Sequence, residues 1–256
     1  YPYMIDGDMI VIYDFAAAKQ IEADLNKAGY RVTFGNVDKD AFKTEIAHMY
    51  RNGYKKIRFM DGKMEPFVVE REELYPYEEF FKDDYITNPG LQAAMLNYFQ
   101  EFRKQAPLEN RGDILKRREQ IMIDMMLNAE YMVPCVKEET EEEVEISHHF
   151  IDITDRVTEK EEGEHVIAIP VFTDGFEMDK CYEGHHENML YKFDELVSLM
   201  DELGASGIII NCLGISYFMR TALIIGDKGL AFNMNNSSEV FCYIKNKNNP
   251  ELSQTL

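Results

Sequence analysis

Hydrophobic and polar residues follow one another along this chain in two similar successions of short apolar runs and amphipathic stretches. In the first succession, the apolar run 9–15 predicts a strand, and Asp14 can cap the helix that follows it. Gly29 closes this helix at the position where a left-handed residue is common. The alternating stretch 30–34 then predicts a half-buried strand.

The first succession continues with a second helix and a third strand. Asp38 can cap this helix, one side of which is apolar, and Gly53 ends it. The apolar residues 55–60 predict another strand, which closes at Asp61-Gly62.

A second succession repeats the order of strand, helix, glycine, strand and turn. The run 166–172 predicts a strand, and Asp174 is the candidate cap after it. A helix is expected over 194–204, followed by a strand at 208–210 and a turn at 211–214. This repeated order predicts that the two halves share an ancestor.

The segment between the two successions is mainly helical. Asn88-Pro89 has the pattern of a cap followed by proline at the first helical position, and a second amphipathic helix is expected from about Asp113. A strand is predicted at 131–136 and a further strand-like stretch at 146–157, flanked by acidic tracts that we interpret as solvated hairpin ends.

We therefore predict a mixed α/β fold, with α+β as the variant, in two related small domains joined by a helical segment. The expected boundaries are 1–82 for the first domain, 83–130 for the helical segment and 131–256 for the second domain. The chain starts at Tyr1 rather than at a methionine, which leaves open a segment before it.

Charge and composition exclude several partners. The formal net charge is −20, which repels phosphate backbones and anionic membranes, so we expect neither nucleic-acid nor membrane binding. No apolar run reaches the length of a membrane span. The four cysteines lie far apart in sequence and form no disulfide framework, which favours a reducing, cytoplasmic location. Cys135 and Cys212 lie in apolar runs and are predicted to be small buried hydrophobes.

Thr173-Asp174-Gly175 is the most conspicuous polar break after a strand. A catalytic aspartate is one interpretation, but no histidine or lysine stands at a matching offset in the first succession. Capping of the following helix explains the same residues without any chemistry, and we prefer it. The ends of the strands would rim the most plausible pocket, with these candidate residues: Phe172, Thr173, Asp174, Asn211 and Gly214.

Two histidine pairs carry the residue types that zinc prefers: His148, His149, His185 and His186. Their spacing matches no recognised zinc pattern, so we prefer exposed histidines in polar loops and predict no metal or other cofactor. Gly214-Ile-Ser216 lacks the closing glycine of a nucleophile elbow, and no phosphate-binding glycine loop is present.

A family resemblance rests on three short runs: Ile169-Pro-Val-Phe-Thr-Asp174, Phe193-Asp-Glu-Leu196 and Gly207-Ile-Ile-Ile-Asn211. They resemble the SseB family, named for enhanced serine sensitivity. The match covers about 125–225 well and 1–75 loosely, and it departs at Cys212, where the family commonly has proline. The resemblance implies a bacterial protein of compact α/β fold, with no agreed catalytic residues.

No converging set of nucleophile, base and phosphate loop is found in the sequence. We therefore expect a non-enzymatic binding or regulatory protein that acts through contacts with a protein partner. The alternative is a small-molecule or metal-binding sensor that uses a pocket between or within the domains.

Overall fold

The computed structural model describes residues 4–5, 7–82, 85–105, 110–139, 144–157, 162–182 and 186–220. The chain divides into two compact units. The first comprises Tyr1–Tyr131 together with Thr173–Gly175, and the second comprises Met132–Phe172 and Phe176–Leu256. The helical segment expected at 83–130 thus lies in the first unit.

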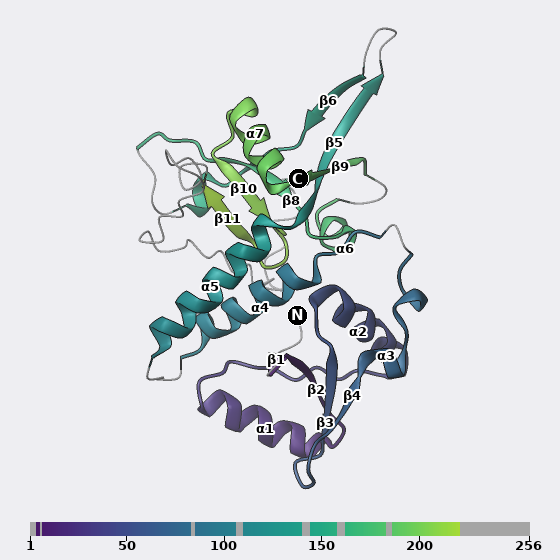
Figure 1. Ribbon diagram of the computed structural model, residues 1–256. Coiled ribbons are helices and arrows are strands. Elements are labelled where there is room, and N and C mark those ends of the chain that lie inside the picture. Colours follow the sequence, from purple (N-terminus) through teal and green to yellow (C-terminus); the bar gives the residue numbers. More distant parts are fainter. Residues whose placement is uncertain are drawn as a thin grey trace. The chain divides into compact units, whose positions relative to one another are not determined.

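A four-stranded sheet forms the centre of the first unit (Figure 1). Its order is β1 (Met4–Ile5), β2 (Asp8–Ile12), β3 (Lys56–Met60) and β4 (Phe67–Glu70). The two central strands β2 and β3 are parallel, and each is flanked by an antiparallel edge strand.

Helices α1 (Phe15–Lys27) and α2 (Lys39–Asn52) connect β2 to β3, and their ends confirm the predicted caps. The carboxylate of Asp14 accepts a hydrogen bond from the backbone N–H of Ala17 at 2.8 Å. The Asp38 carboxylate accepts from the N–H groups of residues 40 and 41. Gly53 ends α2 in the left-handed region, at φ 74°, as C-terminal glycines commonly do.

The strand predicted at 30–34 is wrong. Both backbone groups of Val32 bind the side-chain amide of Asn26, at 2.8 Å each, and the N–H of Phe34 donates to Glu22. Arg31 is left-handed, at φ 53°, which interrupts an extended conformation. The alternation of apolar and polar residues predicted a strand, but the Asn26 side chain of α1 forms hydrogen bonds with the backbone N–H and C=O groups of Val32 that a neighbouring strand would otherwise have bound.

The rest of the first unit is helical. It contains α3 (Arg71–Leu74), the 3₁₀ turn η1 (Tyr77–Glu79), α4 (Pro89–Arg103) and α5 (Arg111–Leu127), and α4 and α5 lie side by side (Figure 1). Pro89 is the first residue of α4, as predicted. Asn88 precedes it without capping, because its Oδ1 accepts a hydrogen bond from the N–H of Glu130 at 3.3 Å. Its Nδ2 donates to the carbonyls of Glu130 and Thr173, each at 2.7 Å.

The second unit contains two sheets. One has the order β11 (Tyr217–Arg220), β10 (Gly207–Ile210), β8 (Ile167–Val171) and β7 (Ile151–Asp152). The other has the order β6 (Val144–His148), β5 (Glu130–Glu139) and β9 (Asn188–Lys192). The remaining elements are η2 (Thr154–Arg156), α6 (Gly175–Asp179) and α7 (Phe193–Leu203), which ends at the left-handed Gly204.

The predicted single stretch 146–157 is therefore wrong, since it is divided among β6, β7 and η2, and its two strands pair in different sheets. By contrast, β8 and β10 form a parallel pair between antiparallel β7 and β11. This is the strand order and sense of β1 to β4 in the first unit. The two halves share this pattern of four strands, while their common ancestry remains a prediction.

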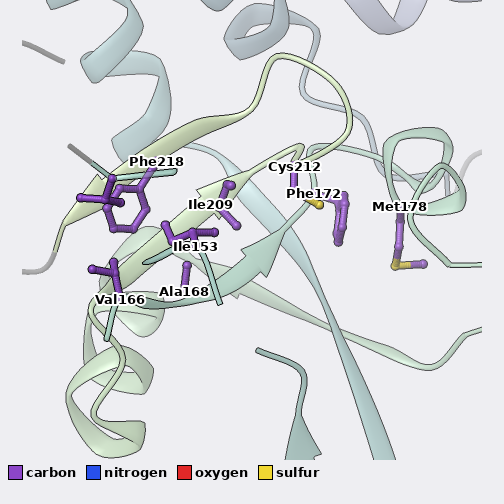
Figure 2. Packing of buried hydrophobic residues seen from close by; sticks show 9 residues of the cluster. Ile153, Val166, Ala168, Phe172, Met178, Ile209, Cys212 and Phe218 are labelled. Carbon is purple, nitrogen blue, oxygen red and sulfur yellow. The ribbon is translucent and has the colours of Figure 1, made fainter. Parts of the chain in front are cut away.

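A cluster of buried side chains on β8, β10 and β11 forms a core of the second unit (Figure 2). It includes Ala168, Ile209 and Phe218 from the strands, and Phe172 and Cys212 just beyond two of them. Helices and small sheets of both parallel and antiparallel strands together confirm the mixed α/β class.

The close packing of β10 on β11 predicts that Gly207 tolerates no side chain. A Cβ atom there would overlap the carbonyl oxygen of Met219. At Gly204 a Cβ atom would contact nothing, and the only cost of a side chain is the strain of the positive φ. We expect Gly207→Ala to lower the free energy of unfolding by about 3 kcal/mol. Gly204→Ala should lower it by about 1 kcal/mol. Urea denaturation compares the two, and equal losses would contradict the packing.

Candidate functional site

Asp174, the candidate for catalysis, is fully buried and forms an ion pair with Arg51 of α2. Its Oδ1 accepts from Arg51 Nε at 3.1 Å and Nη2 at 2.8 Å, and its Oδ2 accepts from Nη2 at 3.1 Å. Both side chains are almost completely removed from solvent, with exposures of 3% and 0%. Nη1 of Arg51 lies 3.0 Å from Nδ1 of His48, which holds the guanidinium from its other end.

Thr173 is equally buried and is held by α4. Gln92 donates to its hydroxyl oxygen at 2.7 Å, and Asn88 donates to its carbonyl oxygen at 2.7 Å. The two residues therefore serve as an anchor that fixes residues 173–175 within the first unit. Asp174 does stand directly before α6, the position expected of a cap, but Arg51 engages its carboxylate.

The sequence did not point to Arg51, because it lies 123 positions from Asp174 in an ordinary amphipathic helix. A buried guanidinium–carboxylate pair compensates its own desolvation when both groups are present, and removal of one leaves an uncompensated charge. We call residues Arg51, Thr173 and Asp174, with Gln92 and Asn88, the anchor cluster.

Of the four candidate histidines, His148, His149 and His186 are half-buried beside tyrosines, which corrects the expectation that they are exposed. Nε2 of His148 lies 3.1 Å from the hydroxyl of Tyr191. His149 and His186 both pack on Tyr182, with ring centroids 5.2 and 5.0 Å from its own. One histidine of each adjacent pair, His149 and His186, therefore contacts the same tyrosine.

Burial lowers the pKa of His148, and burial together with the neighbouring His186 lowers the pKa of His149, which favours neutral imidazoles. His185 lies outside the described residues. Within the described part of the chain, no group of three or more His, Cys, Asp or Glu side chains is placed to hold a metal ion.

The residues proposed to rim a pocket are mostly buried. Phe172 belongs to the core of the second unit, and Asn211 bonds through its N–H to the carbonyl of Val171 at 2.9 Å. Gly214 follows in the same turn and is half-buried. Thr173 and Asp174 belong to the anchor cluster of the first unit. The pocket itself remains a prediction.

An exposed apolar surface lies at the carboxyl ends of β2 and β3. Four large side chains of the segments that follow or face these ends are accessible: Tyr13 58%, Phe15 73%, Met64 69% and Phe67 56%. We call these residues the sheet-end surface. The sequence assigned residues 13–15 to a strand, but β2 ends at Ile12 and leaves the two aromatic rings outside.

Hydrogen bonds and close contacts bring the two loops of the sheet-end surface together. The N–H of Tyr13 donates to the carbonyl of Met60 at 3.2 Å, which continues the pairing of β2 with β3 beyond the strands. Gly62 approaches α1 so closely that a Cβ atom would lie 3.2 Å from that of Ala17. Nζ of Lys63 lies 3.8 Å from the carboxylate of Asp14.

The carboxylates of this surface are held in their charged form. Asp61 accepts from the N–H groups of Lys63 and Met64, each at 2.9 Å, and these bonds lower its pKa. The bond from Ala17 N–H likewise lowers the pKa of Asp14. Partial burial and the negative charge of Asp61 raise the pKa of Tyr13, so its phenol stays neutral. The surface therefore combines neutral aromatic rings with fixed negative charges.

Comparison with known proteins adds no assignment: no protein family, no curated protein and no solved structure matches this chain. The resemblance to the SseB family thus remains a prediction. None of the described helices combines the length and apolar character that a membrane crossing needs.

The anchor cluster predicts a large stability loss when its charges are separated. We expect Arg51→Met and Asp174→Asn each to lower the free energy of unfolding by about 3–5 kcal/mol, because each leaves the partner buried without its counter-charge. The double variant Arg51→Met/Asp174→Asn should lose less than the sum of the single losses, because neither charge is then left buried alone.

Urea denaturation of the four proteins completes this cycle. Lys43→Met is the matched control. Lys43 forms an ion pair with Glu79 at 2.9 Å, close to the 2.8 Å of the Arg51–Asp174 pair, but both of its side chains are exposed. Its expected loss is below about 1 kcal/mol. An Asp174→Asn variant as stable as the unaltered chain would contradict the structural role of this carboxylate.

Proposed function

We propose that this chain is a non-enzymatic binding or regulatory protein and that the sheet-end surface binds its protein partner. The observation that carries the proposal is the accessibility of four large side chains, Tyr13, Phe15, Met64 and Phe67, in the segments around two strand ends. Apolar patches of this kind are uncommon on monomeric proteins and mark interaction sites. The anchor cluster supports the non-enzymatic part, since the most conspicuous polar residues at a strand end are occupied in structural bonds.

The residue types at this surface are those that dominate binding energies. Tyr13, Phe15 and Phe67 offer aromatic area, and Met64 offers an adaptable thioether side chain. Burial of one such side chain contributes about 1.5–3 kcal/mol. Phe67 already stacks on Phe59, with centroids 4.8 Å apart, so its ring is held in place before a partner arrives. Fixing the ring beforehand reduces the entropy lost on binding.

Charge defines the chemistry of the partner. The net charge of −20 attracts a basic segment, and the ionised Asp14 and Asp61 lie within the sheet-end surface itself. We therefore propose a partner segment with one or two apolar anchors flanked by lysine or arginine. β4 is an edge strand and Phe67 is its first residue, so an extended partner segment could also add to the sheet.

Selection from a random peptide library on the immobilised full chain tests this proposal. We expect recovered peptides to combine aromatic or aliphatic anchors with basic neighbours. Phe15→Ser and Met64→Ser should each weaken binding of the best peptide about tenfold, which corresponds to about 1.4 kcal/mol. Fluorescence anisotropy with a labelled peptide measures the change.

Phe102→Ser is the matched control, because Phe102 is also an exposed phenylalanine (42%) but lies away from the sheet-end surface. Its position follows from Gln105, three residues later in the chain. The N–H of Gln105 bonds to Gly29, just past the C-terminal end of α1, whereas Phe15 begins that helix. The two phenylalanines thus stand near opposite ends of a helix about 20 Å long. Peptides that bind the Phe15→Ser/Met64→Ser chain as tightly as the unaltered chain would contradict the proposal, as would concentration-dependent self-association through the same residues.

A further inference from the structure

Two cysteines of the second unit lie side by side although 31 positions separate them in sequence. The Sγ atoms of Cys181 and Cys212 are 3.0 Å apart, and both are free thiols. The spacing pattern of the cysteines gave no sign of this pair, since no C-x-x-C motif is present. The fold alone brings the two sulfur atoms together.

Each cysteine stands in a turn rather than inside a regular element. Cys181 follows α6 and donates its N–H to the carbonyl of Met178 at 2.9 Å. Cys212 lies in the turn after β10 that the left-handed Asn211 begins and that a 2.7 Å bond from Gly214 N–H closes. The present distance exceeds a sulfur–sulfur bond of about 2.05 Å by roughly 1 Å, so the bond forms when the two turns approach by that amount.

The two thiols differ in their surroundings. Cys212 is 3% exposed and belongs to the buried cluster, where it lies beside Phe172 (Figure 2). Cys181 is half-buried and packs against that cluster. The hydrogen bond from Cys212 and a further one from the N–H of Leu213 lower the pKa of Cys181. The same bond and burial raise the pKa of Cys212.

This asymmetry assigns a role to each sulfur. The thiolate is the reactive form of cysteine, so Cys181 is the nucleophile that meets an oxidant first. Cys212 is already within reach of any oxidised form of Cys181, because no other group separates two sulfur atoms at 3.0 Å. Cys212 is buried and keeps its proton, so it is suited to react in the second step, after oxidation has made the Cys181 sulfur electrophilic.

We propose that Cys181 and Cys212 are a peroxide-responsive pair that forms a reversible intramolecular disulfide. The Cys181 thiolate attacks one oxygen of a hydroperoxide, the O–O bond breaks, and the second oxygen leaves as water or alcohol after taking a proton. Cys181 is then a sulfenic acid. The Cys212 sulfur, on losing its proton, attacks Cys181 and displaces the hydroxyl as water. Two thiols lose two electrons in total, and the peroxide gains them.

The disulfide would close a ring of chain from residue 181 to residue 212, which contains β9, α7 and β10. It would tie the turn after α6 to the turn after β10. Reduction by a dithiol would restore both free thiols, so the pair could report the redox state of its surroundings in a reducing compartment. This inference does not depend on the sheet-end surface, which belongs to the first unit.

The test treats the reduced full chain with an equimolar amount of hydrogen peroxide, blocks remaining thiols with an alkylating reagent and measures intact mass and peptides. We expect two fewer alkylated cysteines, a mass lower by two hydrogen atoms before alkylation, and a linked peptide that joins Cys181 to Cys212. Dithiothreitol should reverse all three changes.

Variants separate the steps. Cys212→Ser should halt the reaction at the sulfenic acid of Cys181, which a dimedone probe labels, and Cys181→Ser should abolish both the label and the disulfide. Cys135→Ser is the matched control and should leave disulfide formation unchanged, since Cys135 is 4% exposed and burial raises its pKa.

Peptide mapping of the unaltered chain keeps the test decisive even where a variant fails to fold. Two outcomes would overturn the proposal. In one, Cys181 and Cys212 stay fully alkylatable after peroxide has been consumed. In the other, the disulfide joins a different pair or two separate chains.

Discussion

The buried ion pair between Arg51 and Asp174 is the constraint on which much of this structure depends. A guanidinium and a carboxylate that are removed from solvent must satisfy each other, and three hydrogen bonds of 2.8–3.1 Å between them do so. Thr173 adds bonds to Gln92 and Asn88 on the same short segment. A stretch that follows a strand of the second half is therefore a fixed part of the first unit.

This constraint also bears on function. A polar segment at the carboxyl end of a parallel strand is where α/β proteins often place their chemistry. Here the hydroxyl of Thr173 and the carboxylate of Asp174 are consumed by neighbours, and neither is exposed. The corresponding strand ends of the first sheet have the opposite character, since Phe15 and Met64 are open to solvent. The same four-strand pattern is thus followed by buried, hydrogen-bonded polar residues after β8 and by exposed apolar residues after β2 and β3.

The two proposals address different units and different chemistry. The sheet-end surface offers aromatic area and fixed negative charge to a protein partner. The Cys181–Cys212 pair offers a two-electron reaction between a half-buried cysteine and a fully buried one. A regulatory protein can use both, but either one can fail without consequence for the other, because each rests on its own residues.

The amino-acid sequence by itself determined the elements whose causes are local. Asp14 and Asp38 cap helices, and Gly53 and Gly204 end them, because each acts on backbone groups within a few residues. The apolar runs at 55–60 and 166–172 became strands in the same way. Local patterns therefore gave the mixed α/β class and most helix boundaries.

Only the tertiary structure decided how distant residues meet. The alternation at 30–34 looked like a strand, but the amide of Asn26 captured the backbone of Val32. Arg51 pairs with Asp174 across 123 positions of sequence, and Cys181 contacts Cys212 across 31 positions. No motif spacing in the sequence indicates either contact. Exposure is equally non-local, since whether Phe15 is buried depends on what packs against the first turn of α1. The sequence therefore predicted the elements, and long-range packing decided the sites.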